Sequence, residues 1–297
     1  MPGRKDMCRM YMITTEHLEK GLWFLDEVDF VAGMNFLAII AFQSKVTVLA
    51  FILMSNHLHI IVQGDYDDVV LFMERLKGCH SRYLHNKYGF KEYLRRSGVD
   101  VQEVENKNES IERAVAYVQM NCVAANICSH PTQYQWGTGN LFFNPTHQSG
   151  ISIKDLSKRK RIRLLHSCTN NIPSDWKIGK EGYILPDSYV NRTYVESLFR
   201  TPNRMEFFLR NSSKARKTLE MAEHHLPAFR DQVIVHALPD LCRSLFQKER
   251  FEELSDQEKS EYLRQIRYRF SSNVNQIARI FGLTYGEAAK ILDSFRG

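Results

Sequence analysis

The sequence lacks the features that mark several protein classes. Its six cysteines are scattered and include no C-x-x-C pair, which argues against a zinc ribbon or a disulfide framework and favours a reducing compartment. The longest apolar run, residues 46–54, is far too short to span a bilayer, and the first residues lead into no apolar stretch of the kind a secretory signal needs. We therefore expect a cytoplasmic protein with no membrane partner.

The composition is that of a folded, mildly basic protein. With 43% hydrophobic and 25% charged residues the chain can bury a substantial core, and 297 residues suit two domains of ordinary size. There are 40 Lys and Arg against 34 Asp and Glu, a net charge of +6. This balance permits a polyanionic partner without requiring one.

Hydrophobic periodicity predicts alternating strands and helices in the first half. We expect strands over 9–15 and 46–53, a further strand from His57, and helices over 29–42, 67–88 and 111–126. Ser55-Asn56 is turn chemistry, so the two central strands should form a hairpin. The polar stretch 95–110 is predicted to be a loop.

Composition changes after about residue 145, which suggests three regions. We expect a catalytic domain over 1–147, a basic linker or subdomain over 148–195, and a helical C-terminal domain over 196–297. In the last region, Ser255 and Glu258 have the spacing of a capping box that opens a helix reaching about Phe270.

The most informative stretch is His57-Leu58-His59 within a run of Leu, Ile and Val. In a strand, side chains alternate between faces, so both histidines would point the same way and could share a divalent cation. The pair equally fits two hydrogen-bonded histidines in a half-buried strand. A third alternating histidine, as in histidine-triad hydrolases, is excluded because position 61 is Ile.

Tyr117 offers a nucleophile and Asn121 a third ligand. The two residues are four apart and therefore lie on one helix face. The Asn121 carbonyl oxygen can bind a hard cation, and the Tyr117 phenol can act as a nucleophile. A free phenol titrates near pH ~10, so it would need activation by a neighbouring metal. Spacing alone equally allows a packed tyrosine and a surface asparagine.

Together these motifs resemble the single-tyrosine HUH transposases, most closely the REP-associated tyrosine transposases. The resemblance covers roughly residues 9–140 and is carried by the following stretches: Leu53-Met-Ser-Asn-His57-Leu-His59, Leu76-Lys-Gly-Cys-His-Ser-Arg-Tyr83 with Lys87-Tyr-Gly89, Tyr117-Val-Gln-Met-Asn121, Thr14-Thr15, Asp29 and Tyr134-Gln-Trp136. Two positions depart from the family pattern. Cys122 stands where many relatives have Pro, and the third ligand is often Gln rather than Asn.

The resemblance implies a ferredoxin-like HUH domain around a central antiparallel sheet. With the helical C-terminal domain that the later sequence predicts, the whole chain should be an α+β protein. His57, His59 and Asn121 would hold Mg²⁺ or Mn²⁺, with His80, Glu74 and Glu112 as alternative ligands. Tyr117 would attack single-stranded DNA with hairpin or palindromic structure, giving a 5′-phosphotyrosine and a free 3′-OH. The active unit would be a monomer or a homodimer that exchanges its tyrosine helices.

Three further regions are candidates for DNA contact. Cations and aromatics that suit single-strand binding lie on the helix 67–88 and in the basic run 158–161. They are Lys77, Arg82, Tyr83, Lys87, Lys158, Arg159, Lys160 and Arg161. Residues 275–295 resemble a helix-turn-helix, with Ala278 and Gly282 at the small and turn positions. A solvated helix face and a purely structural helix pair are the competing interpretations.

Two other functions fit the same sequence. One is a non-catalytic DNA-binding regulator on the same fold, which would keep the basic surface and need no metal. The other is an HUH nickase of the replication-initiator type, although the chain has no helicase motifs.

Overall fold

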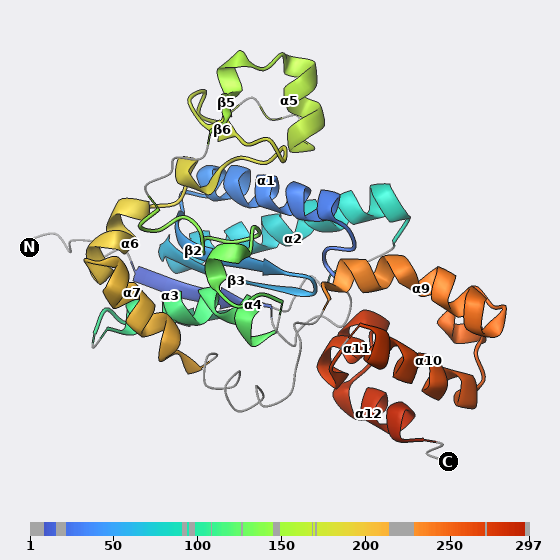
Figure 1. Cartoon of the computed structure of the whole chain (residues 1–297). Coiled ribbons are helices and arrows are strands. Elements are labelled where there is room, and N and C mark those ends of the chain that lie inside the picture. The colour runs from blue at the N-terminus through green and yellow to red at the C-terminus, as the bar shows by residue number, and fades with distance from the viewer. Residues whose placement is uncertain are drawn as a thin grey trace, which may run out of the picture.

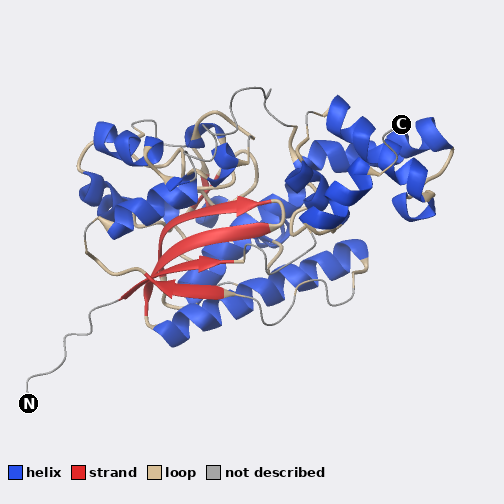
Figure 2. Ribbon diagram, turned by 90° about the horizontal axis from the view of Figure 1, so that it is seen from below, coloured by secondary structure: helices blue, strands red, loops and turns tan. Residues whose placement is uncertain are grey.

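A computed structural model describes residues 9–15, 22–90, 94, 99–107, 109–125, 127–144, 149–167, 169, 171–213, 229–270 and 272–294. These residues form a four-stranded sheet covered by helices, followed by a separate group of C-terminal helices (Figure 1). Figure 2 shows the strands as one twisted sheet with the C-terminal helices gathered beyond one end of it. The expected α+β fold with a helical C-terminal part is confirmed.

The sheet has the order β2-β3-β1-β4, and every neighbouring pair is antiparallel. Its strands are β1 (Arg9–Thr14), β2 (Thr47–Met54), β3 (His57–Gly64) and β4 (Asp100–Glu103). The predicted hairpin is therefore present, with Ser55-Asn56 as its turn. β4 lies inside the stretch predicted to be a loop. It pairs only with β1 at the sheet edge and is mostly exposed, so its polar sequence lacks the alternation of a half-buried strand.

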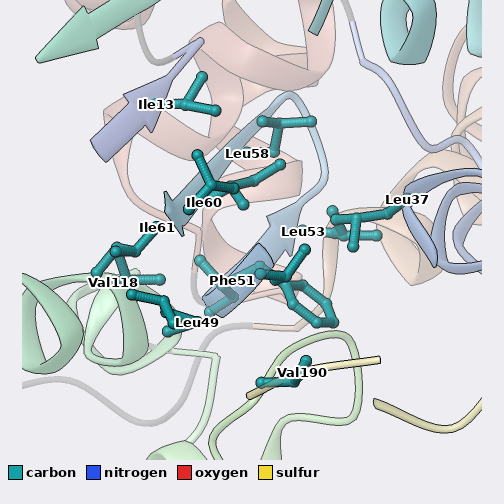
Figure 3. Packing of buried hydrophobic residues seen from close by; sticks show 14 of the residues in the cluster. Ile13, Leu37, Leu49, Phe51, Leu53, Leu58, Ile60, Ile61, Val118 and Val190 are labelled. Atoms are coloured by element: carbon teal, nitrogen blue, oxygen red, sulfur yellow. The ribbon is translucent and has the colours of Figure 1, made fainter. Parts of the chain in front are cut away.

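Helices cover both faces of the sheet. α1 (Glu27–Gln43) and α2 (Tyr66–Tyr88) lie on one face, and α3 (Ser110–Gln119) with α4 (Asn121–Ala124) on the other (Figure 1). Figure 3 shows Ile61 next to Val118 of α3, whereas Leu53 lies next to Leu37 of α1. Since alternate strand residues face opposite ways, His57 and His59 share the α3 face with Ile61.

The outer edge of β2 is covered by two later segments of the chain, residues 136–138 and residues 190–191. Leu53 N donates to Trp136 O at 2.8 Å, and Thr138 N donates to Phe51 O at 3.0 Å. Gly137 fits between them because a Cβ there would lie 2.9 Å from the Phe51 carbonyl oxygen. Trp136 is buried in the core.

The segment after residue 148 forms a small layer on α1. Its elements are β5 (Ile151–Ser152), α5 (Lys158–Leu165) and β6 (Lys177–Ile178), with 3₁₀ turns at Ile153–Asp155 and Pro186–Ser188. Its apolar residues pack on Ala38 and Ile39 of α1. The next helices, α6 (Arg192–Phe199) and α7 (Pro202–Arg210), share the core of the sheet. The domain boundaries at 147 and 195 stay predictions.

The last helices form a second core, which we call the C-terminal module. It comprises α9 (Asp231–Phe246), α10 (Asp256–Arg269), α11 (Val274–Phe281) and α12 (Tyr285–Asp293), with a 3₁₀ turn at Phe251–Glu253. The predicted capping box is present, because Ser255 and Glu258 each accept from the other's backbone N–H. Among the described residues, no helix is long and apolar enough to cross a membrane.

Candidate active site on the histidine strand

The two histidines of β3 face each other on the sheet surface that α3 covers. His57 is 8% exposed and His59 is 1% exposed, and their ring centroids lie 5.1 Å apart at an angle of 86°. With metal–nitrogen bonds of about 2.1 Å, two imidazoles on one ion have centroids roughly 5 Å apart. The spacing of the pair therefore fits a shared divalent ion.

Asn56 orients the first of these rings. His57 Nδ1 lies 2.8 Å from Asn56 Oδ1, an acceptor, so Nδ1 carries the proton and Nε2 holds the lone pair. A histidine held this way presents Nε2 to a metal, because a hydrogen bond on the other nitrogen fixes both tautomer and ring direction. The sequence carries only one signal for this role of Asn56, its place directly before His57.

Tyr117 completes a three-ring group. Its ring contacts His59 edge-on, with centroids 5.6 Å apart at 90°. The phenol is partly exposed, which leaves it open to an incoming chain. The helix that carries Tyr117, α3, packs on β2 and β3.

Asn121 lies just beyond the tyrosine helix, as the first residue of α4. Its Nδ2 donates to the carbonyl oxygens of Tyr117 and Val118, at 2.9 and 3.2 Å. These bonds satisfy carbonyls that a helix leaves without partners at its C-terminal end. The expected continuous helix over 111–126 is therefore wrong in one respect, since α3 stops at Gln119 and α4 starts at Asn121. With the amide nitrogen engaged, the Oδ1 oxygen is the atom that can take a cation.

The alternative ligands do not join the histidine pair. Among the described residues, no three His, Cys, Asp or Glu side chains form a group that could hold a metal. His80 is buried, bonds the Trp23 carbonyl oxygen at 2.6 Å, and burial lowers its pKa to about 4. Glu112 lies 3.7 Å from Arg204, and Glu74 is exposed.

The residues of α2 predicted to contact DNA lie in different environments. Lys77 is only 3% exposed and lies over the Trp23 ring. Lys87 pairs with Asp26 at 2.6 Å and with Asp29 at 2.7 Å. Burial opposes its charge, yet the hydrogen bonds to both carboxylates raise the pKa of Lys87.

The other two α2 residues also differ from each other. Tyr83 donates to Asp29 at 3.0 Å, and burial beside that carboxylate raises the pKa of the phenol. Arg82 is exposed and forms no ion pair with a described residue, so it is the α2 cation most open to a phosphate.

The basic run forms the first turns of α5. Lys158, Arg159 and Lys160 are exposed, Arg161 is partly buried, and the first three form no ion pair with a described residue. Cations at a helix N-terminus repel the positive end of the helix dipole. The arrangement therefore costs stability in the absence of an anion.

The predicted helix-turn-helix corresponds to α11 and α12. Gly282 ends α11 with φ of 63°, the left-handed conformation that favours glycine. Ala278 is buried between the helices. A role of this pair in DNA binding stays a prediction.

Comparisons with known proteins bear on the first half of the chain. Residues 31–121 match the family model described as "Transposase IS200 like", and this segment contains both histidines, Tyr117 and Asn121. The structure titled "Structure of the REP associates tyrosine transposase bound to a REP hairpin" aligns at 12% identity with a TM-score of 0.37, covering 47% of this chain and 84% of that one. A similarity this low adds nothing to the assignment. No curated protein matches significantly. Residues 31–121 are thus similar to the IS200-like transposases.

Proposed function

We propose that this protein cleaves and rejoins single-stranded DNA through a covalent bond to Tyr117, as a step in DNA transposition. The observation that carries the proposal is the edge contact between Tyr117 and His59, 5.6 Å between centroids within one chain. The family of residues 31–121 supports the same reading.

In the cleavage step, Tyr117 Oη attacks the phosphorus of a phosphodiester. The Oη–P bond forms, the P–O3′ bond breaks, the phenol gives up its proton and the 3′ oxygen leaves as a hydroxyl. The 5′ end is then a phosphotyrosine. Rejoining reverses the step with a 3′-OH as nucleophile, and because the count of phosphoester bonds is unchanged, no ATP is required.

His57, His59 and the Asn121 oxygen would hold Mg²⁺ or Mn²⁺. Two imidazoles with an amide oxygen suit Mn²⁺ well, and Mg²⁺ binds such sites with several of its waters retained. When bound, the ion would polarise the phosphate oxygens and make the 3′ oxygen a better leaving group. Asn56 contributes by holding His57 with Nε2 toward the site.

The substrate we propose is single-stranded DNA with a hairpin or palindrome. Its backbone would contact Arg82 and the exposed cations of α5, Lys158, Arg159 and Lys160, with Arg161 beside them. Binding of this kind releases counterions and weakens steeply with salt. We propose that one copy suffices for cleavage, with Tyr117 acting beside the histidines of its own chain.

The test is covalent capture. The full chain is incubated with Mn²⁺ and a labelled single strand carrying a hairpin from the gene's own flanks, then run on a denaturing protein gel. We expect a metal-dependent adduct that Tyr117→Phe and His59→Ala abolish. The matched control is Tyr66→Phe, because this exposed tyrosine at the start of α2 is remote from the histidines. DNA binding with no adduct across several flanking sequences would overturn the proposal in favour of a regulator.

A further inference from the structure

The C-terminal module contacts the turn that precedes the histidines. Ser55 Oγ, in the β2–β3 turn, donates to a carboxylate oxygen of Asp231, the first residue of α9. Figure 1 shows α9 beginning at the end of the sheet where β2 turns into β3. The two residues are 176 positions apart in the chain.

Asp231 is also the centre of the module's own packing. Its side chain is 1% exposed and accepts two bonds from Arg279, at 2.6 and 2.9 Å, and one from Gln276 at 2.8 Å. Burial alone would raise the pKa of Asp231, but the Arg279 guanidinium lowers it, so the carboxylate is charged. A hydrogen bond to a charged acceptor is about twice as strong as one between neutral groups.

Other contacts hold the same turn in place. The Ser55 carbonyl oxygen accepts from the backbone N–H groups of Trp23 and Phe24, at 2.7 and 3.0 Å. Gln232, next to Asp231, donates to the Phe24 carbonyl oxygen at 3.1 Å. The turn is therefore fixed on one side by its own domain and on the other by the first residues of α9.

A short path leads from this turn to the histidine ring. Ser55 is followed by Asn56, whose side chain holds His57 Nδ1 at 2.8 Å. A shift of the turn would move the Asn56 carbonyl and rotate the imidazole. Rings that bind metal need such outer support, and its removal typically costs 10–100-fold in metal affinity.

We propose that Asp231 is a positioning residue for the active site: through Ser55 and Asn56 it sets the direction of the His57 ring. The C-terminal module is then a structural part of the catalytic centre as well as a candidate DNA reader. This inference rests on the proposed metal role of His57.

The deciding variant is Ser55→Ala in the full chain. It removes the bond between the turn and the module, and it keeps the Asp231–Arg279 pair that the module needs to fold. The matched control is Ser260→Ala, which removes a buried serine bond to the Ser294 carbonyl oxygen inside the module. Asn56→Ala removes the last link in the path.

Two measurements need no catalytic turnover. Hydrogen exchange reports the protection of residues 54–58, and the electron paramagnetic resonance signal of free Mn²⁺ reports metal affinity. For Ser55→Ala we expect turn exchange about tenfold faster and the Kd for Mn²⁺ raised about threefold, and for Asn56→Ala a Kd raised about tenfold. Ser260→Ala should match wild type in both.

Three outcomes would overturn the inference. The first is wild-type exchange and wild-type Mn²⁺ affinity in Ser55→Ala. The second is an equal loss of affinity in Ser260→Ala, which would reflect general destabilisation. Both leave the proposed function standing if the wild-type chain still forms its adduct. The third is a wild-type chain that binds no Mn²⁺, which overturns the proposed metal role together with this inference.

Discussion

The two faces of the sheet carry polar clusters built on opposite plans. On the α1–α2 face, the buried carboxylate of Asp29 accepts bonds from two backbone N–H groups, from Lys87 and from two phenols, Tyr83 and Tyr88. On the α3 face, two imidazoles and a phenol meet edge-on, and among the described residues no acid joins them in a metal-binding group.

This difference separates structure from chemistry. The Asp29 cluster balances charge against charge and caps the start of α1, so its members are committed to one another. On the histidine face, Asn56 instead orients the His57 ring from behind, as the proposed metal role of that ring requires. The two clusters should therefore respond in opposite ways to mutation.

The largest effect should be on the α3 face. Tyr117→Phe should lower adduct formation at least a thousandfold, because no other described group stands in for the nucleophile. Its stability in urea should stay within about 1 kcal/mol of wild type, since the ring is kept.

Mixing Tyr117→Phe with His59→Ala chains tests whether the tyrosine acts beside the histidines of its own chain. Restored adduct would mean that tyrosines are exchanged between copies.

The corresponding change on the α1–α2 face is Asp29→Ala. It removes the buried one of the two carboxylates that pair with Lys87 and also removes a cap of α1, so we expect a loss of about 3 kcal/mol in the free energy of unfolding. Adduct yield per folded molecule should be unchanged. Urea denaturation followed by tryptophan fluorescence measures the first quantity and gel quantification the second. Equal loss of both would contradict the division between the faces.

His80, also on the α2 face, predicts a pH dependence. Its pKa is lowered by burial from 6.5 to about 4, so between these values the unfolded chain binds a proton that the folded chain does not. Stability should therefore fall as pH drops from about 6.5 toward 4, by roughly 3 kcal/mol for this group. In His80→Gln this part of the slope should disappear from denaturation curves taken at a series of pH values. An unchanged slope would assign it to other groups.

The smallest effect concerns the exposed first turn of α5. Lys160→Ser should weaken DNA binding at low salt and reduce the slope of log K against log salt by about one unit. It should also stabilise the chain by a few tenths of a kcal/mol, because a cation leaves the helix N-terminus. Fluorescence anisotropy over a salt series provides the measurement. Lys259→Ser in α10, where the lysine is half-buried over the Phe251 ring, should leave the slope unchanged.

Local patterns were enough to predict most of the catalytic half. The β2–β3 hairpin, α1 and α2 follow from hydrophobic periodicity, and alternation along β3 correctly put His57 and His59 on one face. β4 could not be predicted, because an exposed edge strand needs no apolar alternation. The break at Met120 depends on a side-chain bond from Asn121 to carbonyls of the preceding turn, which helical spacing does not reveal.

Contacts between distant segments were beyond the sequence. Nothing near Asp231 indicates that it reaches Ser55, and the capping and periodicity of the C-terminal helices describe only the module itself. In the same way, Lys77 fits a basic helix face by spacing but is buried against Trp23 by tertiary packing. Patterns identify which side chains can do chemistry, and packing decides which of them are presented.

The covered edge of β2 has a consequence for association. Residues 136–138 bond Phe51 and Leu53, and the Asn191 N–H donates to the Val48 carbonyl oxygen, so these outward-facing groups of β2 are not available for a second chain to extend the sheet. The opposite edge is β4, where Asp100 and Glu103 place negative charge among exposed residues. Strand-to-strand aggregation is thus blocked by backbone pairing at one edge and opposed by charge repulsion at the other.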